Sequence, residues 1–138
     1  MQTLGLVTYL VANYDEAIAW FTDTLGWQLI EDTALSAEKR WVVVGPHATQ
    51  GARLLLAKAV GDQQIRAIGN QAGGRVFLFL ATDDFDRVHA SMSAQGVRFL
   101  ETPRTEAYGK VAVFENLYGN RWDLLQSRSR CSKYLIDQ

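Results

Sequence analysis

The chain has 138 residues, of which 48% are hydrophobic and 21% charged, and its formal net charge at neutral pH is -1. This length and composition predict a soluble globular protein with a sizeable core and exclude a disordered chain. The balanced charge, without a run of lysine or arginine, argues against a nucleic-acid partner, and no apolar stretch is long enough to span a membrane. The only cysteine, Cys131, excludes an intramolecular disulfide, which is typical of a cytoplasmic protein.

The first half of the sequence predicts a unit of the form β-α-β-β-β. Leu4–Val11 is apolar on both faces, as expected of a strand that is covered on both sides. Asn13 is a typical helix-capping residue and Gly26 suits the position after a helix, so a helix is expected between them. Three further strands are expected, the first of them half-buried, at Trp27–Thr33, Arg40–Val44 and Arg53–Ala57.

The second half predicts the same unit again, after a linker. Ala59–Gly74 is rich in glycine and lacks strand periodicity, which indicates a linker with one helical turn near Gln63–Ile68. Thr102–Gly109 is predicted as a loop and Ser127–Gln138 as a polar tail. The expected elements of the second unit are a strand at Arg75–Thr82, a helix between Asp84 and Gly96, and strands at Val97–Leu100, Lys110–Glu115 and Asn120–Gln126.

The two halves are copies of one repeat, because corresponding residues keep a nearly constant offset. Leu6 and Phe77 are 77 − 6 = 71 positions apart, and Gly26 and Gly96 are 96 − 26 = 70 positions apart. A single unit could not bury both faces of its sheet, so two units should pair. We therefore expect an α+β fold in which two tandem β-α-β-β-β modules, at about 4–58 and 75–126, form a curved mixed sheet around a cleft. Residues 59–74 would be the linker and 127–138 the tail.

Four segments carry a resemblance to a known family. The first unit contains V-x-Y-L-V-x-N-Y-D-E-A-I-x-W-F followed by L-G-W, within Val7–Trp27. The second contains F-L-x-T-D-D-F at Phe79–Phe85, Q-G-V-R-F at Gln95–Phe99 and F-E-N-L-Y-G-N-R-W-D-L at Phe114–Leu124. In this order, and with the duplication, the chain resembles the vicinal oxygen chelate superfamily, also called the glyoxalase, bleomycin-resistance and extradiol-dioxygenase fold.

The resemblance implies where a metal would be bound in the enzymes of that superfamily. Their His and Glu ligands come from the first and last strands of each unit, and these positions correspond to Leu6, Leu55, Phe77 and Asp123. Only Asp123 can ligate a metal, whereas Zn²⁺ and related ions require three or four side-chain ligands. We therefore expect neither a metal nor another cofactor.

Strand alternation assigns the side chains that would face the cleft. Residues that share a face with Leu6 and Phe77 should line it, whereas Trp122 points the other way and is assigned to the core. Trp41, beside Lys39 and Arg40, and Tyr108, in a loop, are added as residues of the cleft edge. The predicted ligand-binding residues are Leu6, Thr8, Trp41, Arg53, Leu55, Phe77, Phe79, Tyr108, Arg121 and Asp123.

Several of these residues have a structural alternative. Arg53 and Arg121 either bind a ligand through their planar guanidinium groups or pair with carboxylates such as Asp123. Phe77 and Phe79 either form a stacking wall or belong to the core. Asp123 and Arg121 are also weak candidates for catalysis. His89 is predicted to be a solvated residue on a helix surface.

These observations favour a metal-independent protein that binds a small aromatic or anionic compound and has a resistance-type role. A homodimer is expected by resemblance to proteins that sequester bleomycin between two subunits. Because two arginines face one aspartate, the strongly basic bleomycin itself should bind poorly. The alternatives are a lyase, isomerase or dioxygenase-like enzyme with a displaced or metal-free site, and a regulatory or accessory ligand-binding subunit.

Overall fold

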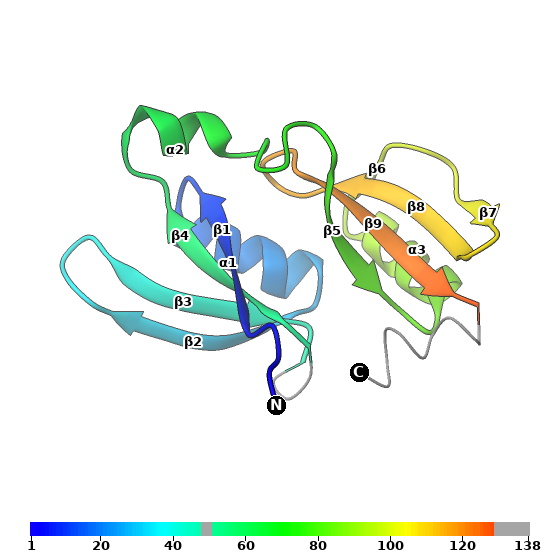
Figure 1. Ribbon diagram of the computed structural model, residues 1–138, viewed down its shortest axis with the longest axis horizontal. Helices are drawn as coiled ribbons and strands as arrows, with labels where there is room; N and C mark the ends of the chain where they lie inside the picture. Colours follow the sequence, from blue (N-terminus) through cyan, green and yellow to red (C-terminus); the bar gives the residue numbers. More distant parts are fainter. Residues whose placement is uncertain (48–50, 129–138) are drawn as a thin grey trace. The chain divides into compact units, whose positions relative to one another are not determined.

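The computed structural model describes residues 1–47 and 51–128, and within them the chain forms two compact units (Figure 1). The first unit is Met1–Gln71, and the second begins at Ala72. Each unit contains a mixed sheet that contacts a helix of its own, α1 in the first and α3 in the second. The predicted α+β class, built from a duplicated unit, is confirmed.

The first unit has a four-stranded sheet in the order β1-β4-β3-β2. Strands β1 and β4 are parallel, whereas β3 is antiparallel to both of its neighbours. The elements are β1 (Leu6–Val11), α1 (Tyr14–Ala19), the π-helical turn η1 (Trp20–Thr24), β2 (Gln28–Ala34), β3 (Arg40–Gly45), β4 (Arg53–Lys58) and α2 (Gly61–Ala67). Helix α2 replaces the single helical turn that was expected in the linker.

The first helix begins and ends where the sequence predicts, but its last turn has an unexpected hydrogen-bond pattern. The side chain of Asn13 caps α1 by accepting a hydrogen bond of 2.9 Å from the backbone N–H of Glu16. The final turn is a π-helix, in which the N–H of Leu25 bonds to the carbonyl of Trp20, five residues earlier, at 3.2 Å. Gly26 then adopts a φ of 74°, a conformation that glycine tolerates best, and the helix stops there.

The core of the first unit lies between α1 and one face of the sheet. Tyr9, Val42 and Leu56 have no exposed surface, and they occupy neighbouring positions on β1, β3 and β4. The ring of Tyr9 meets that of Phe21 edge to face, with centroids 5.7 Å apart. Because side chains alternate along a strand, Thr8 and its neighbours on β4 and β3 lie on the opposite face.

The two edges of this sheet differ in how they are covered. At one edge the Gln71 side chain accepts a hydrogen bond of 2.9 Å from the Leu10 N–H and donates one of 3.4 Å to the Leu10 carbonyl. At the other edge, β2 was expected to be half-buried, but almost all of its residues are exposed. Strand β2 has a sheet neighbour on one side only, and a bulge between Leu29 and Glu31 interrupts its pairing with β3.

The second unit repeats this plan with one additional short strand. Its sheet has the order β5-β9-β8-β6, and β7 pairs with β8. The elements are β5 (Val76–Ala81), α3 (Phe85–Ala94), β6 (Arg98–Phe99), β7 (Arg104–Glu106), β8 (Gly109–Glu115) and β9 (Arg121–Ser127). Strand β7 lies within the segment predicted as a loop, and with three residues it is too short for an alternating pattern to reveal.

A row of aromatic rings fills the core between α3 and its sheet. Phe114 lies between Phe99 and Trp122, with ring centroids 5.7 Å away on each side. His89, predicted to be solvated, joins this row instead. Its ring lies 5.6 Å from that of Phe85 and 4.2 Å from that of Phe99. The prediction was wrong because the polar residues around His89 in the sequence hide that its own helical face points at the sheet.

Replacing Gly109 by alanine should destabilise the second unit, because this glycine begins β8 in a backbone conformation that residues with a side chain rarely adopt. Its φ is 148°, and an added Cβ would clash with the backbone carbonyl oxygen of Gln126 and lie 2.9 Å from the Cα of Ser127. We expect a loss of about 1–3 kcal/mol in the free energy of unfolding, measured by urea denaturation. Gly119→Ala is a suitable control, because its φ is also positive but a Cβ would meet no atom within 4 Å. Equal losses in both variants would show that the close contact is not what matters.

Candidate functional sites on the two sheets

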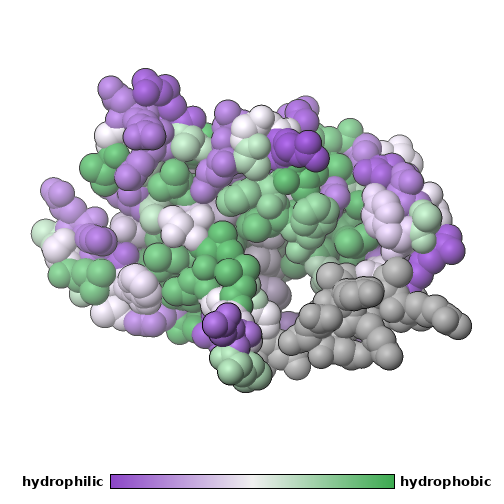
Figure 2. All heavy atoms as spheres, in the orientation of Figure 1, coloured by the Kyte–Doolittle hydropathy of each residue, from purple (hydrophilic) through white to green (hydrophobic). Residues whose placement is uncertain are grey.

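The face of the first sheet opposite α1 brings five of the predicted ligand-binding residues together. Leu6 pairs with Arg53, and Thr8 pairs with Leu55, so the first and last strands place these four residues side by side. Trp41 lies on the neighbouring strand β3. Thr8 is exposed, and Arg53, Leu55 and Trp41 are half-buried. In the view of Figure 2, hydrophobic atoms gather over the strands of this unit.

Two cavities open beside Trp41, which lines both of them. The larger, of about 890 Å³, is bounded by the start of α1, the β2–β3 turn, the end of β4 and the start of α2. The smaller, of about 420 Å³, is lined by Leu6, Val43 and Arg53, which lie on the face of the sheet opposite α1. Sites for small molecules are commonly concavities of about 300–1,000 Å³, so both cavities have a suitable size.

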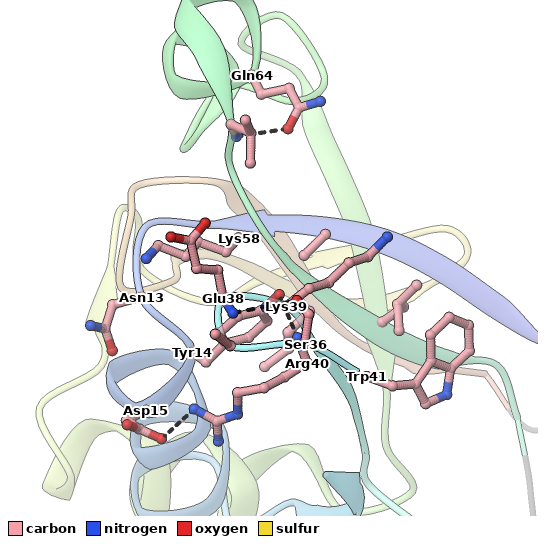
Figure 3. A pocket seen from close by; sticks show the side chains of 15 residues that line it. Asn13, Tyr14, Asp15, Ser36, Glu38, Lys39, Arg40, Trp41, Lys58 and Gln64 are labelled. Atoms are coloured by element: carbon pink, nitrogen blue, oxygen red, sulfur yellow. Dashed lines mark hydrogen bonds and ion pairs between the residues drawn. The ribbon is translucent and has the colours of Figure 1, made fainter. Parts of the chain in front are cut away.

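A single arginine holds the wall of the larger cavity together. The guanidinium of Arg40 donates two hydrogen bonds to the carboxylate of Asp32, at 3.1 and 2.6 Å. It donates a third, of 2.9 Å, to Asp15, which Figure 3 shows. It also lies over the ring of Tyr14, 5.1 Å from its centroid. The hydrogen bonds to these two acids raise the pKa of Arg40 and lower that of Asp32. Arg40 therefore joins β2 to α1 and has a structural role.

The second sheet brings together the other predicted residues. Asp123 pairs with Phe79 on β5 and with Val113 on β8, so these three side chains share one face. The phenyl ring of Phe79 is 61% exposed, although a core residue was one of its two expected roles. Asp123, in contrast, is only 7% exposed. An exposed aromatic ring thus lies beside a buried carboxyl group.

The buried carboxyl group of Asp123 is unusual in its surroundings. Its Oδ1 atom has no hydrogen-bond partner within the described residues. Desolvation raises its pKa, the charge of Glu101 raises it further, and the charge of Arg104 acts in the opposite direction. A perturbed carboxyl group on a partly exposed face is a candidate for ligand contact or proton transfer.

The cation that acts on Asp123 is Arg104, which the sequence did not predict. Its guanidinium bonds to Glu101 at 2.9 Å and Glu106 at 2.7 Å, and it lies 3.5 Å from the hydroxyl of Tyr108. Glu101 in turn accepts a hydrogen bond from the backbone N–H of Val113 at 3.3 Å. The alternating charges of Glu101, Arg104 and Glu106 are a signal that could have indicated this network, had the segment been assigned to a strand edge.

The remaining predicted residues lie near this network or at the end of the sheet. Tyr108 is 47% exposed and follows β7. Arg121 is exposed at the start of β9 and pairs in register with Glu115 and Val76. Phe77 is half-buried at an irregularity in the pairing of β5 with β9. The roles of all ten residues in binding remain predictions, and Cys131 lies outside the described residues.

Replacing Asp123 by asparagine should stabilise the protein at neutral pH. In the folded protein, the pKa of this carboxyl lies above its ordinary value of 3.8, which applies to the unfolded chain. As the pH rises, the unfolded chain therefore loses the proton before the folded protein does. The folded protein loses stability as the pH rises from 3.8 to the pKa of the folded state. Asparagine carries no such penalty. We expect a melting temperature roughly 2–4 °C higher at pH 7, equivalent to about 1 kcal/mol, and a difference that shrinks as the pH falls towards 3.8. A destabilised variant, or a difference that does not depend on pH, would contradict this expectation.

A metal site and a membrane-spanning helix would each leave a clear structural signature in residues 1–47 and 51–128. In this part of the chain, no group of three or more His, Cys, Asp or Glu side chains is placed to hold a metal ion. No helix in the same part is long and apolar enough to cross a membrane. Of the four positions where the resemblance implies metal ligands, Leu6, Leu55 and Phe77 offer no donor atom.

Comparison with known proteins decides the family. A family model described as the glyoxalase/bleomycin resistance protein/dioxygenase superfamily matches residues 3–124. The chain belongs to this superfamily. The match spans both units and confirms the resemblance that the sequence segments suggested.

Individual proteins are similar to this one over nearly the whole chain. An uncharacterized protein of Shewanella frigidimarina (strain NCIMB 400) is 52% identical over 126 residues, which cover 91% of this chain and 93% of that protein. The crystal structure of UcmS2 matches with a TM-score of 0.78 and 25% identity, over 91% of this chain and 98% of that one. That of TnmS3, described as an antibiotic binding protein from Streptomyces sp. CB03234, matches with a TM-score of 0.74 and 24% identity, over 93% and 98%. This last likeness shows the fold alone.

Proposed function

We propose that this member of the glyoxalase/bleomycin resistance protein/dioxygenase superfamily binds a small aromatic or anionic compound without a metal and has a resistance-type role. One observation carries the proposal. At three of the four positions that would hold a metal, the sheets present the apolar residues Leu6, Leu55 and Phe77. An apolar surface with a few polar groups suits a ligand bound by contact and hydrogen bonds better than metal chemistry.

The similarity to a protein described as antibiotic-binding supports the hypothesis that this chain binds a ligand. TnmS3, whose fold this chain shares, is described as an antibiotic binding protein. Sequestration needs only affinity and a site that excludes water from part of the ligand. The two cavities beside Trp41 and the exposed ring of Phe79 provide surfaces of this kind, each within its own unit.

The proposed binding residues have distinct roles. Trp41 and Phe79 offer flat apolar surfaces on which an aromatic ligand can stack. Arg53 lines the smaller cavity and can donate hydrogen bonds to a carbonyl or anionic oxygen. The carboxyl group of Asp123 can exchange a hydrogen bond with a ligand through Oδ1, which has no partner within the described residues.

We also propose that the functional unit is a homodimer, which analytical ultracentrifugation would test.

A titration with a small panel of compounds tests the binding function. Isothermal calorimetry with neutral and anionic bicyclic aromatic compounds should give saturable binding in the micromolar range or tighter. Bleomycin, followed by tryptophan fluorescence, should not saturate in that range, because its positive charge meets Lys39 and Lys58 at the larger cavity and Arg53 at the smaller one. Micromolar saturation with bleomycin, or no binding to any aromatic compound, would contradict the proposal.

A second candidate function is acid–base catalysis through Asp123. The observation in its favour is the raised pKa of this buried carboxyl, next to an exposed aromatic ring. It predicts that some bound compound is converted to a product, and that Asp123→Asn abolishes the conversion while binding remains. If mass spectrometry recovers every bound compound unchanged after prolonged incubation, the binding function stands alone.

A further inference from the structure

We infer that the larger cavity of the first unit is a subsite for a planar aromatic molecule with an anionic group, whose ring packs on Trp41 and whose anion binds Lys39. This inference rests on the proposed function and deepens it, because it names a ligand class and a place. It adds Lys39, which the sequence did not put among the binding residues. The reasons are the size of the cavity, the unpaired ammonium group of Lys39 in its wall, and the fixed position of the turn that carries this lysine.

The cavity has the dimensions and the mixed lining of a small-molecule site. Its volume is about 890 Å³, within the usual range of about 300–1,000 Å³. Trp41 and Leu55 are half-buried, and together with Ala57 and Val60 they give the cavity an apolar side. A flat hydrocarbon ring placed there would remove apolar surface from water on both partners.

The wall of the cavity carries charges of both signs, and two of its cations are unpaired. Arg40 is engaged by Asp15 and Asp32, and these three residues together carry a net charge of -1. Lys39, Lys58 and Glu38 also line the cavity and together carry a net charge of +1. Among the described residues, neither lysine forms an ion pair, since no carboxylate oxygen lies within 4.0 Å of either ammonium group. The unpaired ammonium group of Lys39 is therefore available to an anionic group of a ligand.

The turn that carries Lys39 is held in place by its own hydrogen bonds. The hydroxyl of Ser36 accepts hydrogen bonds from the backbone N–H groups of Lys39, at 3.1 Å, and Glu38, at 3.4 Å. The Tyr14 hydroxyl accepts another, of 3.3 Å, from the N–H of Arg40. In Figure 3 the side chain of Lys39 leaves this turn towards the side of the cavity where Trp41 lies, whereas that of Lys58 points to the other side. A preformed backbone reduces the entropy lost on binding.

A pair of probes that differ only in charge tests the inference. 1-Anilinonaphthalene-8-sulfonate carries a sulfonate, and N-phenyl-1-naphthylamine is the same ring system without it. Each would be titrated by fluorescence against the full chain and its variants. We expect the sulfonate to bind at least about tenfold more tightly than the neutral probe, which corresponds to about 1.4 kcal/mol. Raising the ionic strength should weaken only the sulfonate, since salt screens charge interactions.

Three variants locate the effect. Lys39→Gln should weaken the sulfonate about tenfold and change the neutral probe less than about twofold. Trp41→Leu should weaken both probes, because both share the ring that packs there. Arg66→Gln is the matched control, since it removes one exposed cation from α2 without touching the lining of the cavity, and it should change neither probe. Circular dichroism spectra and melting temperatures of the variants would verify that they fold.

The possible results separate this inference from the proposed function. Equal affinities for the two probes, or equal effects of Lys39→Gln and Arg66→Gln, would overturn the assignment of an anionic ligand to this cavity. If Trp41→Leu and Lys39→Gln both leave binding unchanged while Phe79→Ala weakens it, the cavity is not the subsite but the protein still binds aromatic compounds. If neither probe binds, the subsite is refuted, and the wider compound panel then decides the proposed function independently.

Discussion

Replacing Phe114 by alanine is expected to lower the free energy of unfolding by about 3–5 kcal/mol, the usual cost of removing a buried phenyl ring. Phe114 has no exposed surface, and its ring lies between Phe99 and Trp122, 5.7 Å from each. The substitution would leave a cavity in a row of aromatic rings that links β6, β8 and β9. Urea denaturation, followed by the tryptophan fluorescence that Trp122 contributes to, measures the loss.

The control for Phe114→Ala is Phe114→Leu, which retains most of the buried volume. It should cost less than roughly 1.5 kcal/mol, as swaps that nearly conserve volume usually do. If the alanine variant lost less than about 1 kcal/mol, the position of Phe114 at the centre of the aromatic row would be wrong.

Replacing Phe79 by alanine should have the opposite profile, with little effect on stability and a large effect on binding. Phe79 lies on the same sheet as Phe114 but is 61% exposed, next to Asp123. Exposed substitutions usually change stability by less than about 0.5 kcal/mol. An aromatic anchor of a binding site typically contributes about 2 kcal/mol or more, so affinity for an aromatic ligand should fall roughly 30-fold.

Calorimetric titration of Phe79→Ala, beside urea denaturation of the same preparation, provides both measurements. Phe79→Tyr is the matched variant, because it retains the ring and should retain most of the affinity. A wild-type affinity in the alanine variant would remove Phe79 from the binding surface. A loss of stability comparable to that of Phe114→Ala would instead show that the ring belongs to the core.

The periodicity of the sequence was sufficient to predict most of the architecture. Alternation along the strands correctly separated Trp122, which is buried, from Asp123 and Phe79, which share the opposite face. The duplication predicted two sheets of the same plan, because the residues that build each strand recur at a nearly constant offset. These features depend on local sequence and on the regular alternation of side chains between the two faces of a strand, so they can be predicted from the sequence alone.

What the sequence could not reveal depends on contacts between distant segments. Arg104 acts on Asp123 only because β7 pairs with β8, and β8 pairs with β9. The larger cavity likewise requires the start of α1, the β2–β3 turn and α2 to meet around Trp41. His89 was assigned to solvent for the same reason, because its contact with Phe99 joins α3 to β6. None of these encounters leaves a periodic signal.

The central claim, that the protein binds its ligand without a metal, is tested most directly by combining metal analysis with a binding titration. Protein purified without chelator would be analysed for zinc, nickel, iron and manganese, and titrated with 1-anilinonaphthalene-8-sulfonate before and after treatment with EDTA. We predict a metal content far below one ion per chain and the same affinity in both titrations. Stoichiometric metal, together with loss of binding after EDTA treatment, would contradict the claim.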